Sequence, residues 1–168
     1  MSMISNFLRV SQEELDSFLE NSTLLEDRFY NEGNDEDPCM LDIDKAWDGI
    51  IYLLTGKSIQ GIDMSDQSGL HTVILSGQLI DPEQHMGYGP AHYLTPDRVQ
   101  ELSVAISKET RESMLSRFKP ADMHDVYPTI WEEEGEEAFD YVFANFQELQ
   151  KFYAQAAKEN QAVISILN

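Results

Sequence analysis

The strongest hydrophobic pattern in the chain predicts a long amphipathic helix from Phe139 to Lys158. Its apolar residues recur every three or four positions, which places them on one stripe along about five helical turns. The stripe consists of Phe139, Val142, Phe143, Phe146, Leu149, Tyr153 and Ala156. Because such an aromatic stripe must be buried, we expect smaller elements to cover this helix and the fold to be organised around it.

Both ends of the sequence have the pattern of buried strands. Residues 3–10 alternate loosely between apolar and polar positions, and Phe7 interrupts the alternation, as expected of a strand that is covered on most of both faces. Residues 162–167 form a continuous apolar, β-branched run. Since chain ends commonly lie close together in a compact domain, we expect the two strands to be neighbours in one sheet against the long helix.

Two further helices have clear boundary signals. The first follows Ser11, whose spacing from Glu14 fits a capping box. The second is expected from Leu41 to Gly56, with Asp42 as its cap and the final glycine as its end. An apolar face that includes Trp47 supports this second helix.

The middle of the chain is less regular. Residues 69–76 suit either a buried strand or a short helix. The glycines and proline of residues 87–90 predict a fixed turn, four extended residues follow, and Pro96 is favoured as the first residue of a helix. Another helix is expected after Ser107. With no internal repeat or linker, residues 1–168 are predicted to be a single mixed α/β domain of the α+β class.

The charge of the chain is strongly negative. The 11 basic and 31 acidic residues give a formal charge of −20, and both halves are acidic: 17 acidic against 4 basic residues up to position 84, then 14 against 7. Such a surface repels nucleic acid and anionic lipid and attracts a basic partner at low salt. High negative charge also keeps a protein soluble, which is the alternative explanation.

Cysteine content and hydropathy indicate the compartment. Cys39 has no cysteine to pair with, and its acidic neighbours would raise the pKa of a thiol. No segment reaches the roughly 18 apolar residues that span a bilayer, and the N-terminus lacks a signal-peptide pattern. We therefore expect a cytoplasmic protein with no membrane association.

Catalytic and cofactor motifs are missing from the sequence. It contains no dinucleotide or phosphate loop, no nucleophile elbow and no His-Glu-x-x-His. The loop from Asn31 to Pro38 has the acidic residues of a calcium loop without its twelve-residue pattern, and the four histidines are scattered. We expect no cofactor and no metal, and the absences weigh against the common enzyme classes.

Several aromatic and polar side chains near the ends of elements are the candidate binding residues. They are Trp47, Asp48, Tyr88, His92, Tyr93, Tyr127 and Trp131. Rings of this kind either line a ligand pocket or close the end of an ordinary core. In a pocket, His92 is the member that exchanges a proton near neutral pH. Asp44 and Asp48 could form an acid–base pair, or their charge could simply favour a helix N-terminus.

Five segments, taken in order, resemble the YfbM-like family of bacterial proteins of unknown function. They are residues 3–10, 41–48, 53–56 and 87–96, together with Tyr127, Pro128 and Trp131. The likeness runs the length of the chain. It implies one mixed α/β domain in a bacterial cytoplasm and brings no catalytic residues to carry over.

Three functional hypotheses remain, of which a plain structural subunit would show neither a basic partner nor a ligand-sized cleft. The first is a non-enzymatic module whose acidic face engages a basic protein, as immunity or inhibitor proteins do, with Trp131 beside the run of glutamates at positions 132–137 as an apolar anchor. The alternative is a small-molecule-binding or hydrolytic protein that uses a pocket near Trp47, His92 and Trp131. If the aromatic residues converge on a cleft, Trp47 and Trp131 should be partly accessible, whereas full burial of both rings with no cavity beside them would assign them to the core.

Overall fold

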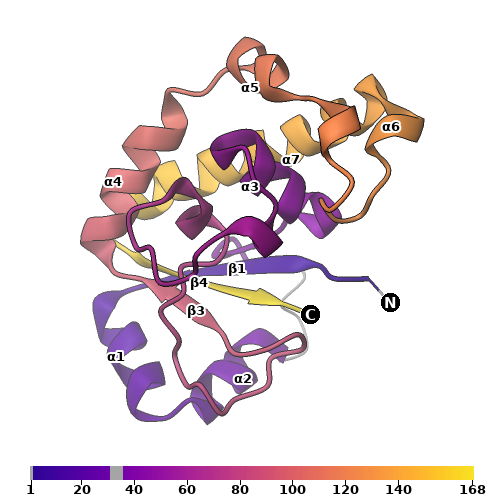
Figure 1. The fold of residues 1–168 in the computed structure, drawn as a ribbon. Helices are drawn as coiled ribbons and strands as arrows, with labels where there is room; N and C mark the ends of the chain where they lie inside the picture. The colour runs from indigo at the N-terminus through magenta and orange to yellow at the C-terminus, as the bar shows by residue number, and fades with distance from the viewer. Residues whose placement is uncertain (1, 31–35) are drawn as a thin grey trace.

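A four-stranded antiparallel sheet crosses the middle of the molecule (Figure 1). The computed structural model describes residues 2–30 and 36–168. The strand order is β2-β1-β4-β3. The strands are β1 (Ser5–Val10), β2 (Met40–Asp42), β3 (His92–Leu94) and β4 (Ala162–Leu167).

The two central strands come from opposite ends of the sequence, as predicted. β1 and β4 pair over their full length, from Ser5 opposite Leu167 to Val10 opposite Ala162. Both faces of β1 are covered. The ring of Phe7 packs against that of Phe152 on the long helix, with 6.0 Å between ring centroids, whereas Leu8 belongs to the core on the other face. The sheet therefore has a core on each side.

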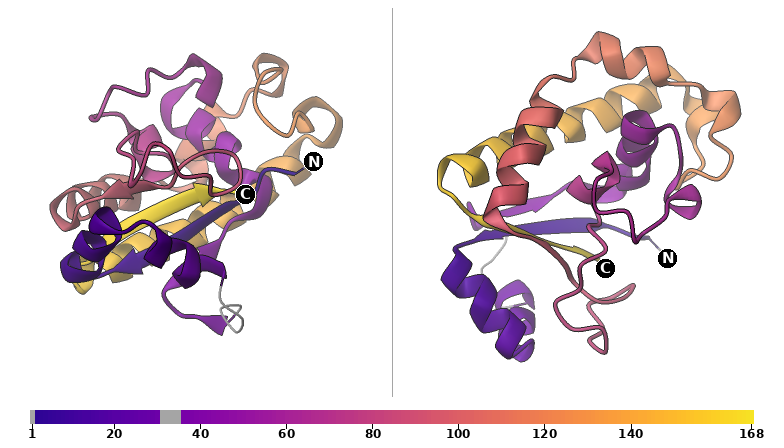
Figure 2. Two further views of the ribbon diagram at one scale, coloured as in Figure 1. Left: turned by 90° about the horizontal axis from the view of Figure 1, so that it is seen from below. Right: turned by 60° about the vertical axis from the view of Figure 1, so that its left-hand side comes forward.

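The larger core lies between the sheet and the long helix. Figure 2 shows α7 (Glu136–Lys158) and α4 (Pro96–Ser107) on the same side of the sheet, and α3 (Trp47–Thr55) and α5 (Arg111–Arg117) complete this layer. The predicted stripe of α7 is buried except for Phe143, which is partly covered by the guanidinium of Arg111. The hydroxyl of Tyr153, near the C-terminal end of the stripe, donates to the carbonyl of Val73 at 2.7 Å.

The smaller core lies on the opposite face under α1 (Gln12–Glu20) and α2 (Thr23–Tyr30). The capping box at Ser11 and Glu14 is confirmed. Helix α2 follows almost at once and was not predicted, because its apolar positions make only a weak stripe and a single residue, Leu25, is fully buried. The remaining cover comes from the segment before β3, through Ile80 and Met86.

The helix predicted from Leu41 to Gly56 is wrong in its first third. β2 and a 3₁₀ turn, η2 (Asp44–Ala46), precede α3. The side chain of Asp42 accepts a hydrogen bond from the backbone of Asp44, whose φ of 51° lies in the left-handed region, so a tight turn replaces the first helical turn. The C-terminal end at Gly56, with φ of 80°, is confirmed.

The remaining elements of residues 2–30 and 36–168 are short. They are the 3₁₀ turns η3 (Ile59–Gly61), η4 (Leu70–Val73) and η5 (Pro120–Asp122) and the helix α6 (Trp131–Glu134). η4 decides the ambiguity at residues 69–76 in favour of a short helix. The acidic loop weighed as a calcium site lies mostly outside the described residues. Across the part of the chain that the structure describes, no helix has the length and apolarity needed to cross a membrane.

Candidate functional site

The predicted aromatic cluster separates into two groups. Trp47, Asp48, Tyr127 and Trp131 gather around the start of α3. Tyr88, His92 and Tyr93 belong to β3 and the turn before it. No hydrogen bond or ring contact joins the two groups within the described residues. The alternative pocket therefore has its two tryptophans in one group and His92 in the other, with no contact between the groups within the described residues.

Both tryptophans of the first group are core residues. Each is only 2% exposed, which agrees with the alternative that these rings close the end of the core. Trp47 stacks on Tyr127 with 5.7 Å between ring centroids and donates from its indole nitrogen to the carbonyl of Met3. The indole of Trp131 donates to the carbonyl of Val126 at 2.7 Å. Trp131 cannot serve as an exposed anchor, because its indole N–H already has a hydrogen-bond partner and its ring is covered by the core.

Asp48 links the start of α3 to two loops. It is 1% exposed, and its two carboxylate oxygens accept hydrogen bonds from the backbone N–H groups of Ile59 at 2.7 Å and Tyr127 at 2.9 Å. Burial raises the pKa of Asp48 to about 6 and outweighs the two hydrogen bonds, which favour the charged form; nearby Asp125 raises the pKa further. Asp44 instead accepts from the hydroxyl of Tyr141, so the two aspartates do not form an acid–base pair.

His92 is held as a neutral side chain. Its Nδ1 accepts a hydrogen bond from the backbone N–H of Gly77 at 3.0 Å, which requires that nitrogen to be unprotonated. Burial lowers the pKa of His92 to about 4. The expectation that His92 exchanges a proton near neutrality is therefore wrong. Tyr93 contributes its carbonyl to Ser76, and Tyr88 is 43% exposed.

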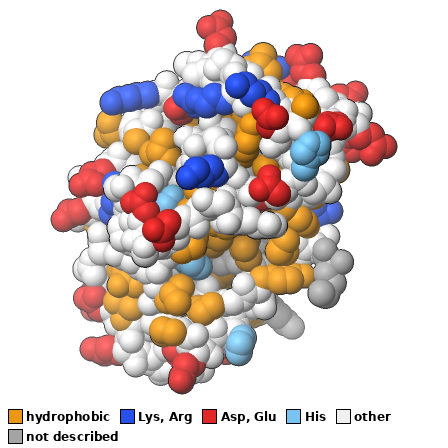
Figure 3. All heavy atoms as spheres, in the orientation of Figure 1, with side chains coloured by type: hydrophobic (Ala, Val, Ile, Leu, Met, Phe, Trp, Pro, Cys, Tyr) orange, Lys and Arg blue, Asp and Glu red, His pale blue; other side chains and the backbone are white. Residues whose placement is uncertain are grey.

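Acidic side chains gather at the end of the molecule where α6 meets α7, and Figure 3 shows red side chains concentrated in this region. We call this surface the acidic end. Its members are Asp122, Asp125, Glu132, Glu133, Glu134, Glu136, Glu137 and Asp140, all exposed. Arg111 pairs with Glu136 and Asp140, and His124 lies 3.8 Å from Glu132. Glu133, Glu134 and Glu137 form no ion pair with a described residue, so much of this charge is not neutralised.

A notch of about 190 Å³ opens into the acidic end. Its apolar part comes from Pro120, Met123 and the covered edge of Trp131, and its polar part comes from His124, Glu132 and Glu133. Thr129 also lines the notch with φ of 65°, a backbone region that β-branched residues rarely adopt. Carboxylates beside a small apolar recess are complementary to a long basic side chain, which has an aliphatic stem and a charged tip.

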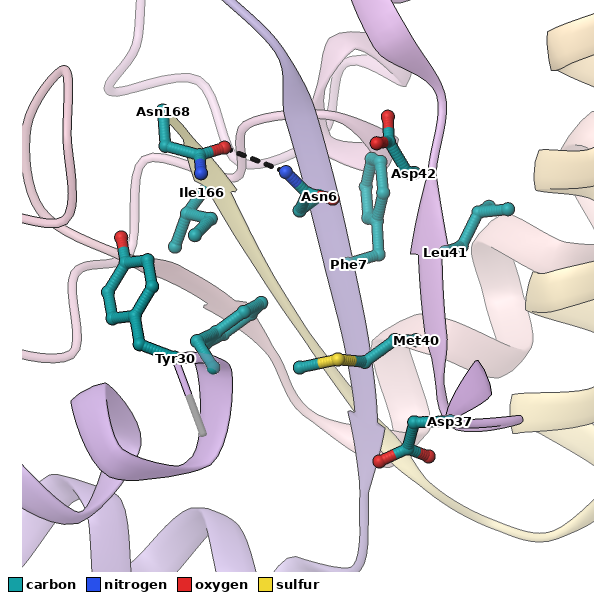
Figure 4. A pocket seen from close by; sticks show the side chains of 10 residues that line it. Asn6, Phe7, Tyr30, Asp37, Met40, Leu41, Asp42, Ile166 and Asn168 are labelled. Carbon is teal, nitrogen blue, oxygen red and sulfur yellow. Dashed lines mark hydrogen bonds between the residues drawn. The ribbon is translucent and has the colours of Figure 1, made fainter. Parts of the chain in front are cut away.

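A second hollow, of about 260 Å³, lies on the other face of the sheet, between α2 and the strands (Figure 4). We call it the sheet hollow. Its lining is Asn6, Phe7, Phe29, Tyr30, Asp37, Met40, Leu41, Asp42, Ile166 and Asn168. Asn6 on β1 donates from Nδ2 to Oδ1 of Asn168 at 2.7 Å. Within the described residues, no group of three or more histidine, cysteine or acidic side chains could hold a metal ion.

The comparison with known proteins identifies the family. The model of a domain of unknown function, DUF1877, matches residues 1–166. The chain belongs to the DUF1877 family. The protein of unknown function YfbM from Escherichia coli has a similar structure, with a TM-score of 0.76 and 19% sequence identity over 99% of this chain and 100% of that one. At that identity the likeness shows the fold alone, and no curated protein matches the sequence.

The residues that line the sheet hollow of this DUF1877 chain were not among those predicted from the sequence. They come from β1, α2, β2, the end of β4 and Asp37 before β2, segments that no motif connects. α2 was not predicted, and β2 was taken for helix. The one usable signal was the pair of aromatic residues Phe29 and Tyr30 just before a polar loop, because large rings at the end of an element often border a recess.

Proposed function

We propose that this DUF1877 protein is a non-enzymatic binding module whose acidic end engages a basic protein, in the manner of an immunity or inhibitor protein. The observation that carries the proposal is the exposed run of glutamates around α6 beside an apolar notch. Three of these glutamates have no ion pair with a described residue, so their charge is available to a partner. The proposed setting is a bacterial cytoplasm, as the family resemblance implies.

The net charge of the protein and the shape of the notch contribute differently to the proposed binding. The net charge of −20 produces a long-range field that speeds encounter with a cationic surface. Exposed charges are screened beyond about 8–10 Å at physiological ionic strength, so charge alone gives weak binding. The notch supplies the short-range contact: a basic side chain of the partner would place its stem against Met123 and Pro120 and its tip between Glu132 and Glu133.

The direction of insertion differs from the sequence-based hypothesis. There, Trp131 was the anchor that entered the partner. Since Trp131 is buried and hydrogen-bonded to Val126, we now propose that the partner contributes the inserting side chain and that Trp131 forms part of the wall. Arginine is enriched among residues that dominate interfaces, and it also suits a site with two carboxylates.

A capture experiment tests the proposal. Immobilised protein is exposed to a bacterial lysate at about 50 and 300 mM salt, a range over which contacts between many charges weaken strongly. The test variant replaces Glu132, Glu133 and Glu134 by Gln. We expect the wild type to retain a basic protein at the lower salt and to lose most of it at the higher, and the variant to retain little at either.

The matched control removes the same charge elsewhere. Glu13→Gln, Asp16→Asn and Glu20→Gln lie on the exposed side of α1, on the other face of the sheet. This control should capture the partner as well as the wild type does. Recovery of no basic protein at low salt, or equal loss in both triple variants, would leave the charge as a property that serves solubility and would end the proposal.

A further inference from the structure

The sheet hollow has two hydrogen-bond acceptors side by side. Asn6 and Asp42 are directly opposite each other on β1 and β2, so their side chains share one face and lie close together. Since Asn6 uses Nδ2 to donate to Asn168, its Oδ1 remains as an acceptor. The Oδ1 of Asp42 accepts a hydrogen bond from the backbone N–H of Asp44, so its second carboxylate oxygen remains as an acceptor. This end of the hollow can therefore receive a group that donates more than one hydrogen bond.

The rest of the lining is apolar and aromatic. Met40 extends across the hollow toward α2, as Figure 4 shows, and Ile166 lines the hollow from β4, near Asn168. Phe29 and Tyr30 bring two rings from the end of α2. Aromatic faces attract cations as well as apolar groups. A ligand with a short apolar body would therefore displace water from this side.

The charge of the lining selects among ligands. No described lining residue is Lys or Arg, and the two charged residues are Asp37 and Asp42. Asp37 is already engaged: its carboxylate pairs with Arg28 at 2.7 Å, and a hydrogen bond from the backbone N–H of Cys39 lowers the pKa of Asp37. Asp42 is exposed and has no ion pair with a described residue. The described lining itself therefore carries negative and no positive charge, which disfavours a phosphate or carboxylate ligand.

We propose that the sheet hollow binds a small organic cation, an amine or guanidinium group on a short apolar body. The cationic group would donate to Asn6 Oδ1 and Asp42, and the body would lie against Met40, Ile166 and Phe29. The hollow is a little smaller than the roughly 300–1,000 Å³ of sites for drug-sized ligands, so a compact molecule suits it. This activity does not depend on the acidic end, which lies on the other face of the sheet.

Three probes of one shape separate charge from shape. They are benzylamine, benzyl alcohol and benzoate, titrated into the full chain while ¹H–¹⁵N spectra report on backbone and side-chain amides. We expect benzylamine to shift the side-chain amide signals of Asn6 and Asn168, benzyl alcohol to bind about tenfold more weakly, and benzoate not to bind. A charge-assisted hydrogen bond has a strength that corresponds to a difference of about this size.

Substitutions locate the site. Asp42→Asn keeps the shape and the acceptor for Asp44 but removes the charge, and it should weaken benzylamine binding about tenfold. Asp27→Asn, an exposed position on α2 outside the hollow, removes the same charge and should change nothing. Met40→Trp should abolish binding by filling the hollow, provided that its spectrum shows a folded chain; if it does not fold, the two aspartate variants decide.

Three results would overturn the proposal. One is equal binding of benzylamine and benzyl alcohol, which would mean that the hollow does not select a cation. Another is an equal loss of affinity in Asp27→Asn and Asp42→Asn, because the effect would then come from net charge. The third is a set of shifted signals that leaves out Asn6 and Asn168.

Discussion

The carboxylate of Asp48 joins α3 to the loops that contain Ile59 and Tyr127. In the sequence this residue looked like a negative charge near a helix N-terminus. Its carboxylate instead accepts hydrogen bonds from two backbone N–H groups. These groups belong to loops that are 11 and 79 positions away in the chain. Local sequence patterns do not contain that information, because the loops are positioned by the core beneath them.

Replacing Asp48 by Asn tests this role. The amide of asparagine has one acceptor, so one of the two backbone N–H groups would lose its partner in a buried place. We expect Asp48→Asn to lower the free energy of unfolding by about 2–3 kcal/mol at pH 7, measured by urea denaturation. Asp27→Asn, at an exposed position, should lie within about 0.5 kcal/mol of the wild type.

The pH dependence of the stability difference between wild type and Asp48→Asn reports the titration of Asp48. Because burial raises the pKa of Asp48 to about 6, the folded state binds a proton there more tightly than the unfolded state does. That contribution to stability is full below about pH 4 and is lost as pH rises through about 6. The stability difference between wild type and Asp48→Asn should therefore be about 1 kcal/mol larger at pH 5 than at pH 7. A difference that shrinks at pH 5 would contradict the raised pKa.

Helices whose apolar residues recur with a helical period were predictable from the sequence. Elements whose type depends on one tight turn were not. The spacing of apolar residues was sufficient for α7, and Pro96 marked the start of α4. β2 and η2 escaped prediction because the turn at Asp42 and Asp44 interrupts a run that reads as helix. For the candidate site, the sequence left open whether the aromatic residues line a pocket or close the core, because local spacing does not show which residues the core covers.

The contact between α3 and α6 gives a prediction at this scale. A Cβ atom on Gly49 would lie 2.7 Å from Cη2 of Trp131 and 3.0 Å from Cγ2 of Val142, and the indole is held in place by its hydrogen bond to Val126. Alanine in a helix gains about 1 kcal/mol over glycine, but overpacking costs about 1–3 kcal/mol. Because 2.7 Å is far shorter than an ordinary contact, the overpacking cost should lie in the upper part of that range, and we expect Gly49→Ala to be destabilised by about 1–2 kcal/mol net.

Gly61 provides the matched control. A Cβ there would meet Lys57 at 3.5 Å, an ordinary contact with a flexible side chain. Gly61→Ala should therefore stay within about 0.5 kcal/mol of the wild type in the same urea titration. If Gly49→Ala were as stable as this control, the packing of α6 against α3 would be looser than the structure indicates.

For the whole molecule, the sheet divides two surfaces with different chemistry. The acidic end belongs to the side of α7, and the sheet hollow belongs to the side of α1 and α2. Composition predicted the negative charge, and the family resemblance agreed with the fold. Neither could place the charge relative to a hollow, because that placement arises only when β1 and β4 bring the two ends of the chain together.

The pairing of β1 with β4 also sets the order of events during synthesis. β1 leaves the ribosome first, but its partner, Ala162–Leu167, is translated more than 150 residues later. At about 5–20 residues per second the wait is on the order of ten seconds. During that time Phe7 and Leu8 are apolar side chains without their native cover, a target for chaperones. A nascent chain stalled after residue 158 should therefore be cleaved readily by protease, whereas the released full chain resists; equal resistance would show that the sheet forms without β4.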